Sequence, residues 1–412
     1  RFLFLLIFST LLDYYTGIKM SDAKNQATKK FWFWLSISVN LGFLGVFKYY
    51  NFFCQSFTEV LNRLGFSVDP FLIQVILPVG ISFYTFHGLS YVIDVYKNRI
   101  KAERNFVDYA LFVSFFPLLV AGPIERATPL LPQLKVPRTF NRVAAIDGMR
   151  QLLWGLVKKV VVADNCALVA NTVFDAPQGW GGAGLWLAVF CFTIQIYCDF
   201  SGYSDIAIGI ALILGYRLKE NFNNPYLAPN ITSFWRRWHI SLSLWLRDYI
   251  YIPLGGNRKG VFLTYIFLLT TMLIGGFWHG ADWRFVFWGF AHGMLLIIHK
   301  LLSPKEPSNR WWLRGLGIVF TFHCVGLLWI FFRAESIQVA FESIKLLTLN
   351  NNLAEFGAFW SARPEVILLL LFSALIVFLP EAWKQSLINH VLSLPLYLWP
   401  LIFLIALQLI IQ

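Results

Sequence analysis

The sequence predicts an all-α, polytopic integral membrane protein with about ten transmembrane helices, plus re-entrant and interfacial amphipathic helices. Hydrophobic residues make up 58% of the 412 residues and charged residues only 14%, and the mean hydropathy is +0.61. Soluble domains carry about 25% charged residues, so this composition excludes a water-soluble fold. The charges that remain are mostly basic, with 34 Lys and Arg against 22 Asp and Glu.

A transmembrane helix needs about 20 mostly apolar residues, and several stretches of the chain meet this requirement. In order, the predicted spans are 2–18, 31–50, 71–96, 151–174, 185–214, 261–279, 283–302, 313–332, 365–380 and 394–411. The apolar stretch 106–124 contains Pro117, Gly122 and Pro123, so we expect a re-entrant segment there. Because the chain opens at Arg1 inside an apolar run, we expect one or more N-terminal spans to be missing.

The basic residues lie in loops that fall on one side of this predicted layout. Loops 19–30 and 97–105 each carry four Lys or Arg against one acid, and loop 217–259 carries seven against two. Cytoplasmic loops of membrane proteins are enriched in Lys and Arg. We therefore expect the cytoplasmic loops to be 19–30, 97–105, 125–150, 217–259 and 303–314, with 51–70 and 351–364 on the other side.

The first polar group expected at membrane depth is His279, in the run 278–283. Helical geometry places it on the order of 27 Å from the cytoplasmic end of a helix that starts at Val261. Alternatively, Gly275 and Gly276 break the helix and leave His279 at mid-depth. Ionisable groups in a membrane are costly and mark functional sites, and a neutral imidazole is suited to accept a proton from a hydroxyl. The competing interpretation is a histidine hydrogen-bonded in a turn or placed in an interfacial Trp belt.

The second group is the Trp- and Arg-rich run 235–249. Helical periodicity puts four apolar residues on one stripe: Trp238, Leu242, Trp245 and Tyr249. Arg236, Ser243 and Arg247 fall on the opposite side, with His239 at the border. The run predicts either an amphipathic helix in the cytoplasmic interface, or a helix whose His239 faces a cavity while the arginines bind phosphates or an acidic partner.

The third group lies inside the apolar run 185–214 and comprises Asp199, Ser201, Tyr203 and Asp205. Two carboxylates at this depth should be paired, protonated or exposed to a wet cavity. Their spacing of six residues does not put them on one helical face, so a catalytic carboxylate pair is disfavoured. We expect these residues, together with Asp282, to form a buried polar network that supports the site.

The cysteines and the remaining histidines do not predict a metal or redox centre. The five cysteines are scattered and form no CxxC pair. A zinc site built from His279, Asp282 and His292 is the alternative, but its spacing matches no zinc pattern. The sequence therefore predicts no bound metal.

Together these runs resemble the membrane-bound O-acyltransferase (MBOAT) family, and within it the bacterial alginate O-acetyltransferase branch. The resemblance rests on Trp235–Asp248 with the following Gly-Gly-Asn-Arg turn, and on Trp278–Gly280. Further matches lie at 77–84, 121–124, 199–205 and 220–222. The resemblance predicts one MBOAT-like transmembrane domain over 1–412, with the family core at about 72–300.

The resemblance implies a membrane-embedded O-acyltransferase that passes acetyl from a cytoplasmic thioester donor to hydroxyls of an exported polysaccharide, alginate-like or peptidoglycan. It implies that His279 is the catalytic histidine and His239 the second family histidine. It also implies a multi-pass protein of the bacterial inner membrane with no bound cofactor, since acetyl-CoA or an acyl-carrier protein is a co-substrate. An extracytoplasmic SGNH-type acetyltransferase is the expected partner. Teichoic-acid D-alanyl transferases belong to the same family and stay an alternative.

The residues favour the same chemistry when they are considered without the resemblance. A hydroxyl attacks a thioester only with help from a base, and the absence of a Ser-x-Gly nucleophile elbow favours direct transfer. The basic run is expected to receive the anionic donor rather than nucleic acid, through Trp235, Arg236, Arg237, Ser243, Arg247, Asp248 and Trp278. A lipid or glycan transporter is the alternative class, but transporters often contain internal repeats and this sequence has none.

Overall fold

The structure is a computed structural model that describes residues 2–74, 76–302, 310–349 and 354–362, with isolated residues beyond 362. Within these residues every element is a helix, which confirms the predicted all-α class. The predicted spans 365–380 and 394–411 lie outside the described residues.

The N-terminal helices pack as a unit of three. They are α1 (Phe2–Ser21), α2 (Gln26–Leu44) and α4 (Ile81–Tyr96). Helix α2 continues through a π-helical turn, η1 (Gly45–Tyr49), into α3 (Tyr50–Arg63). The predicted span 31–50 is therefore part of one 38-residue helical segment. Single π-helical turns of this kind are frequent at functional sites.

The predicted span 71–96 is wrong over its first ten residues. The described part of this stretch before Ile81 is not helical. Pro70 and Pro78 have no backbone N–H to continue a helix, and Gly80 takes a left-handed φ of 76° just before α4. A Cβ at Gly80 would also clash with the carbonyl oxygen of Leu119. Apolar composition extends across this break, and so composition alone overestimated the helix.

The segment predicted to be re-entrant is made of short helices. They are α5 (Phe106–Val113), the 3-10 turn η2 (Phe116–Leu118) and, after a non-helical stretch, α6 (Ala127–Leu134). An eight-residue helix is about 12 Å long, too short to cross a membrane of about 30 Å. These helices are too short to span a membrane, and a re-entrant segment at 106–124 stays a prediction.

A long antiparallel helix pair follows and is held together by facing glycines. One rod consists of α7 (Arg142–Leu156), the π-helical η3 (Val157–Ala163) and α8 (Asp164–Phe174), and the other is α9 (Gly182–Ile213). A Cβ on Gly148 would lie 2.6 Å from the carbonyl oxygen of Gly209, and a Cβ on Gly202 would lie 2.7 Å from that of Gly155. Small residues allow membrane helices to approach this closely, so larger side chains are excluded at both crossings.

The run 235–249 does not form the single amphipathic helix that was predicted. It is divided among α10 (Ile231–Trp235), α11 (Ile240–Leu246) and the π-helical η6 (Arg247–Tyr251), which leads into α12 (Ile252–Leu254). The break falls at 236–239, where His239 takes a left-handed φ of 42°. The predicted apolar stripe of Trp238, Leu242, Trp245 and Tyr249 is buried inside the protein. The interfacial interpretation of this run is therefore wrong.

The C-terminal part of the described chain contains three long apolar helices and two shorter ones. They are α13 (Val261–His279), α14 (Trp283–Leu302), α15 (Trp311–Arg333), α16 (Ile337–Leu346) and α17 (Ala354–Ala362). Helix α13 runs unbroken through Gly275 and Gly276, so the expected alternative of a glycine break is wrong. Gly276 instead lets α13 approach α14, since its Cβ would lie 3.0 Å from the Cα of Gly289.

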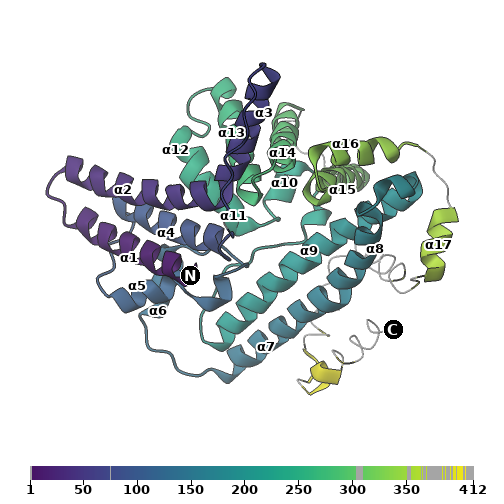
Figure 1. Ribbon diagram of the computed structural model, residues 1–412. Helices are drawn as coiled ribbons and strands as arrows, with labels where there is room; N and C mark the ends of the chain where they lie inside the picture. The colour runs from purple at the N-terminus through teal and green to yellow at the C-terminus, as the bar shows by residue number, and fades with distance from the viewer. Residues whose placement is uncertain are drawn as a thin grey trace.

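Six helical segments in the described residues are long and apolar enough to cross a membrane. They are 3–21, 26–63, 182–213, 261–279, 283–302 and 311–333. The predicted total of about ten is not confirmed. The predicted span 151–174 is helical but carries Lys158, Lys159 and Asp164, and α4 has only 16 residues. The chain is nevertheless a multi-pass membrane protein, and Figure 1 shows its long helices arranged in adjoining bundles.

Hydrogen bonds join the basic loops to one another, which agrees with their predicted position on one side. Lys29 donates to the Asn98 side chain at 2.7 Å, and Lys135 pairs with Glu103 at 2.8 Å. Farther along the chain, Arg126 pairs with Asp248 at 2.7 Å. Loops 19–30, 97–105, 125–150 and 217–259 therefore share one face of the molecule. The positive-inside rule predicts that this face is the cytoplasmic one.

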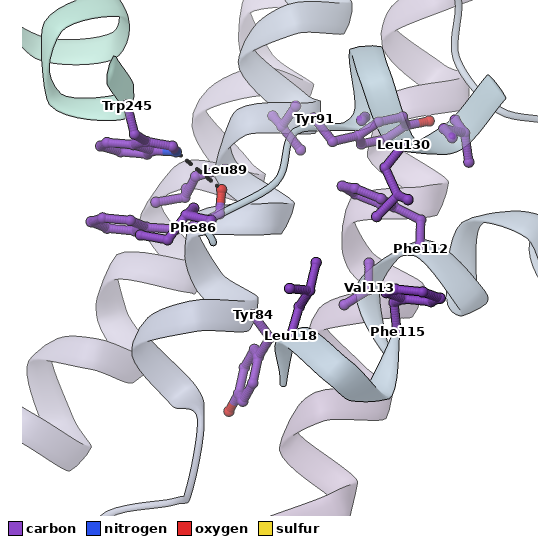
Figure 2. Packing of buried hydrophobic residues seen from close by; sticks show 14 of the residues in the cluster. Tyr84, Phe86, Leu89, Tyr91, Phe112, Val113, Phe115, Leu118, Leu130 and Trp245 are labelled. Carbon is purple, nitrogen blue, oxygen red and sulfur yellow. Dashed lines mark hydrogen bonds between the residues drawn. The ribbon is translucent and has the colours of Figure 1, made fainter. Parts of the chain in front are cut away.

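Two buried apolar clusters meet beside the candidate site. The first is centred on α4, and Figure 2 shows the Trp245 indole stacked on Phe86, with its N–H donating to the Phe86 carbonyl. Trp278 also stacks on Phe86, with ring centroids 5.3 Å apart. The second cluster includes Trp238, which directly precedes His239. The loop that carries His239 thus lies against the junction of the two clusters.

Candidate active site

His279 is the last residue of α13, and aromatic rings surround it on three sides. Its ring centroid lies 5.0 Å from Trp278, 5.2 Å from Trp288 on α14 and 5.2 Å from Phe332 on α15. Gly280 is extended and ends the helix directly after the histidine. The eighteen residues that precede His279 in α13, at a rise of 1.5 Å each, place it about 27 Å from the N-terminal end of the helix.

His239 is buried and is held by a polar group that joins three separate segments. Its Nδ1 lies 3.1 Å from Oδ1 of Asn221, and the Ser241 hydroxyl donates to the same oxygen at 2.8 Å. The Asn221 amide in turn donates to the Ser204 hydroxyl of α9 at 3.2 Å. These bonds fix the imidazole orientation, while Nε2 has no hydrogen-bond partner. A buried nitrogen without a partner is available to a ligand.

A continuous series of ring contacts joins His239 to His279 and then to His292. The His239 and Trp278 centroids are 6.2 Å apart, and on the other side of His279 the Trp288 and His292 centroids are 4.6 Å apart. His292 is fully buried on α14, and neither of its ring nitrogens has a partner. The fold therefore gathers three histidines from two helices and a loop around one set of tryptophans.

Lys48 lies on the π-helical turn η1 and contacts the end of α13. Its ammonium group donates to the Trp278 carbonyl and, at 3.0 Å, to the Ser82 hydroxyl. The adjacent Tyr49 hydroxyl donates to the Phe277 carbonyl at 3.2 Å. The last carbonyls of a helix have no partner within the helix and carry partial negative charge, so a cation is stabilising there. Lys48 and Tyr49 thus hold the backbone that carries His279.

The tryptophans around the histidines supply hydrogen-bond donors. Among the described residues, the indole N–H groups of Trp235, Trp278 and Trp288 are buried without an acceptor. Their rings are packed against His292, His279 or both. Buried donors without partners are rare in proteins, and such donors stabilise an oxyanion when a substrate is bound. The site therefore combines bases with donors in a largely apolar setting.

The predicted donor-binding residues divide into two groups in the structure. Trp235 and Trp278 lie with the histidines, whereas Arg236 and Arg247 are exposed at the basic face. Ser243 donates to the Trp238 carbonyl at 3.3 Å, and the carbonyl of Arg237 accepts from the Asn223 backbone N–H at 2.9 Å. The fold therefore brings the two tryptophans to the site and leaves the two exposed arginines on the basic face.

Asp248 anchors this basic face. It accepts two hydrogen bonds from Arg247, at 2.6 and 3.2 Å, and one from Arg126 at 2.7 Å. Burial alone would raise the pKa of Asp248, but the hydrogen bonds from the two arginines outweigh it and hold that pKa below its ordinary value. Asp248 is therefore ionised and orders two guanidinium groups.

The predicted supporting network on α9 differs from the observed one. Asp205 pairs with Lys158 at 2.6 Å and Asp199 with Lys159 at 2.8 Å, so both carboxylates bind the neighbouring rod rather than the histidines. Ser201 is buried and Tyr203 is largely exposed, and Asp282 accepts from the Arg284 backbone N–H at the start of α14. The polar contacts to His239 come from Asn221 and Ser241 instead, and Ser204 of α9 holds Asn221.

Three residues of the site were not assigned a role from the sequence. Asn221 lies in the matched run 220–222, but a loop asparagine has no periodicity that marks it. From the sequence, His292 has a role only in the alternative zinc site, as a metal ligand. Lys48 lies inside the apolar run 31–50, and its charge within that run is the only sequence feature that distinguishes it. In the described part of the chain, no group of three or more His, Cys, Asp or Glu side chains is arranged to hold a metal ion.

Comparison with known proteins identifies the family. The model of the membrane-bound O-acyltransferase family matches residues 97–305, which confirms the resemblance drawn from the sequence. The probable alginate O-acetylase AlgI of Pseudomonas putida is 45% identical over 342 residues, or 82% of this chain and 69% of that protein. The peptidoglycan O-acetyltransferase of Helicobacter pylori is 37% identical over 374 residues, or 84% of this chain and 70% of that protein.

A more distant relative is the teichoic acid D-alanyltransferase of Bacillus subtilis, which is 29% identical over 266 residues and matches 60% of this chain. The chain spans 65% to 69% of the length of five AlgI proteins. The matched region of the family model contains His239, His279 and His292.

Proposed function

The chain belongs to the membrane-bound O-acyltransferase family, and we propose that it transfers an acetyl group from a cytoplasmic thioester to a hydroxyl of an exported polysaccharide. One observation carries the proposal most directly. His279 ends a membrane helix beside indole N–H donors that have no acceptor. A base next to unpartnered donors is the arrangement that acyl transfer to a hydroxyl requires. The named activities of the relatives from Pseudomonas and Helicobacter favour acetyl over D-alanyl.

His279 acts as the general base in this proposal. Its neutral imidazole accepts the proton of the acceptor hydroxyl while the oxygen forms a bond to the thioester carbonyl carbon. The carbonyl π electrons move to oxygen, and the resulting oxyanion is stabilised by the nearby indole N–H groups, with Trp278 the first candidate. The carbonyl re-forms as the carbon–sulfur bond breaks, and the departing thiolate takes the proton from His279. No acyl-enzyme is needed.

His239 supports the reaction from the cytoplasmic side of the site. Asn221 and Ser241 occupy its Nδ1 side, so Nε2 is the nitrogen left to contact a substrate. The Asn221 oxygen is an acceptor, so Nδ1 carries the ring proton and Nε2 is an acceptor. We assign Nε2 to accept a hydrogen bond from an N–H or O–H group of a bound substrate. The left-handed backbone at His239 turns the chain so that this imidazole is buried among Phe200, Phe222 and Trp278.

Lys48 is a positioning residue in this account. Its ammonium group binds the Trp278 carbonyl, one residue before the base, and bridges α13 to Ser82 on α4. Precise placement of a base contributes strongly to catalysis, since small displacements cost large factors in rate. A lysine that holds the helix end therefore affects turnover without touching the substrate.

The donor enters from the basic face, where Arg236 and Arg247 are exposed to receive its phosphates or the acidic surface of an acyl-carrier protein. The acceptor reaches His279 from the opposite face of the bacterial inner membrane. An SGNH-type acetyltransferase outside that membrane is the expected partner for delivery. The donor is a co-substrate, and the proposal requires no bound cofactor.

Mass spectrometry of cell-surface polysaccharides tests the proposed function. A strain that lacks this chain is compared with the same strain complemented with the wild-type sequence. We expect one polymer to lose mass in steps of one acetyl group in the deletion strain and to regain it on complementation. Unchanged acetylation of every exported polymer would overturn the proposal. A loss of D-alanine esters from teichoic acid would replace acetyl by D-alanyl as the transferred group.

A further inference from the structure

A cavity of about 700 Å³ opens on the basic face. All of its lining residues lie between positions 20 and 101, far in the sequence from the three histidines of the candidate site. It lies between the turn that joins α1 to α2 and the loop that follows α4. Four of its lining residues are cationic, and none is acidic: Lys24, Lys29, Arg99 and Lys101. The loops that form it are two of those placed on the cytoplasmic face by their Lys and Arg content.

The acids near this cavity are already occupied. Asp94 pairs with Arg99 at 2.9 Å and also accepts from the Tyr249 hydroxyl. Asp22, which lies between two lining residues in the sequence, pairs with Arg104. Lys29 donates to the Asn98 amide oxygen. Within the described residues, Lys24 and Lys101 form no ion pair, so the cavity carries an uncompensated positive charge.

The two helices that meet at the cavity expose apolar side chains. Phe31 is 60% exposed and Trp34 is 52% exposed, and their spacing of three residues puts them on one face of α2. Tyr15 on α1 is also exposed and packs against Trp32 of α2. Both helices are long and apolar enough to be candidate membrane spans. Because the turn between α1 and α2 lines the cavity, both helices lead from the cationic residues to exposed apolar side chains.

We propose that this cavity binds the phosphate-bearing headgroup of an anionic phospholipid, whose acyl chains lie along the exposed apolar face of α1 and α2. Basic pockets between membrane helices on the cytoplasmic side select anionic headgroups. A water-soluble phosphate would use the cations alone and leave the adjoining apolar face without a role. The phospholipid uses both features, and that is why it is the favoured occupant. The site is independent of the acyl-transfer reaction.

Native mass spectrometry of the purified full chain in detergent tests this site. Phosphatidylglycerol and phosphatidylcholine with identical acyl chains are added separately, and the bound fraction is measured against lipid concentration. We expect phosphatidylglycerol to bind at least about fivefold more tightly, and this preference to weaken in 1 M salt, where the screening length falls to about 3 Å. Equal binding of the two lipids would overturn the proposal.

Two double variants locate the binding. K24Q/K101Q removes the two unpaired cations of the cavity, and we expect it to weaken phosphatidylglycerol binding by about fivefold for each charge lost. R258Q/K259Q removes two exposed cations from the turn after α12 on the same face, and we expect less than a twofold change. Equal losses in the two variants would show general surface attraction and contradict a specific site.

A competition experiment distinguishes binding of a lipid from binding of a soluble phosphate. Glycerol 3-phosphate, added at the concentration of the lipid, is expected to leave bound phosphatidylglycerol in place because it lacks acyl chains. Displacement at equal concentration would assign the cavity to a soluble phosphate and overturn the lipid proposal. H279A is expected to bind the lipid like the wild type, so this test and the test of acyl transfer fail separately.

Discussion

Two of the buried polar clusters in the described part of the chain differ in how completely their hydrogen bonds are satisfied. In the N-terminal unit, Asp13 of α1 accepts from Ser36 at 2.6 Å and from Asn40 at 2.7 Å. Ser9 then donates to the side-chain oxygen Oδ1 of Asn40 at 2.7 Å. Around the candidate active site, Nε2 of His239 and both ring nitrogens of His292 are buried without partners.

This difference separates a structural role from a catalytic one. A satisfied polar network in a membrane protein joins helices and leaves nothing free to bind a substrate. Unsatisfied buried groups cost stability unless a ligand completes them. We therefore expect substitutions at Asp13 to affect stability and substitutions at the histidines to affect turnover.

The largest effect on stability is expected at Asp13. D13A leaves the Ser36 and Asn40 donors buried without their acceptor, so the free energy of unfolding should fall by about 3 kcal/mol. D13N is the matched control, because its amide oxygen still accepts, and it should retain most of the stability. Thermal unfolding in detergent measures both, and transfer activity per folded molecule should be unchanged. Equal stability of D13A and the wild type would contradict the structural role assigned to the Asp13 cluster.

The next effect is expected at His239. H239N removes the imidazole but suits the left-handed backbone, since asparagine tolerates positive φ. The transfer rate should fall about a hundredfold, as for loss of a group that contacts the reacting substrate, while the unfolding temperature stays within a few degrees of the wild type. Rates of thioester consumption in detergent or nanodiscs provide the measurement. A fully active H239N would show that His239 is a packing residue.

A smaller effect is expected at Lys48. K48M removes the bond to the Trp278 carbonyl and should lower kcat about tenfold with little change in KM, because the base is misplaced while the substrate contacts persist. K48R keeps a cationic donor and should restore most of the rate. Steady-state kinetics of the two variants separates these outcomes. If K48R is as slow as K48M, positioning by a cation at the helix end is not the cause.

The smallest effect is expected at Asp248, and it depends on pH. Because the pKa of Asp248 is lowered in the folded protein, its contribution to stability is present above the unfolded pKa of about 3.9 and is lost as pH falls through the folded pKa. D248N should therefore reduce the free energy of unfolding by about 1 kcal/mol at pH 7. The difference from the wild type should narrow below pH 4. Unfolding temperatures measured across this range would refute the ion-pair account if the difference were independent of pH.

Helix content and the gathering of the basic loops on one face could be predicted from the sequence because both depend on local composition. The length of the apolar runs predicted the bounds of α13 and α14 closely. The Lys and Arg content of the loops predicted that they lie on one face, where Lys135 and Arg126 pair with acids of other loops. Helix breaks were harder to predict, since Pro78 and Gly80 end an apolar run without changing its hydropathy. The division of 235–249 at His239 depends on tertiary contacts with Asn221.

The position of the histidine that we propose as the base could be predicted from the sequence, whereas the residues around it could not. His279 follows a long uncharged run, and its cost in a membrane makes it conspicuous. Asn221 and Lys48 act through contacts with residues 18 and 230 positions away, and no local pattern encodes such contacts. Asp199 and Asp205 were conspicuous for the same reason as His279, yet lysines of the neighbouring rod satisfy them. Cost alone therefore does not separate a catalytic group from a paired one.

The rate of acetyl transfer by H279A tests the central claim most directly. The purified variant is supplied with a thioester donor and a polysaccharide acceptor, and H323A serves as the control, since the His323 ring nitrogen lies 2.8 Å from a backbone carbonyl of its own helix. We predict that H279A loses transfer by about 10²–10⁴-fold at an unchanged unfolding temperature, while H323A keeps the wild-type rate. An H279A rate within twofold of the wild type would contradict the assignment of His279 as the base.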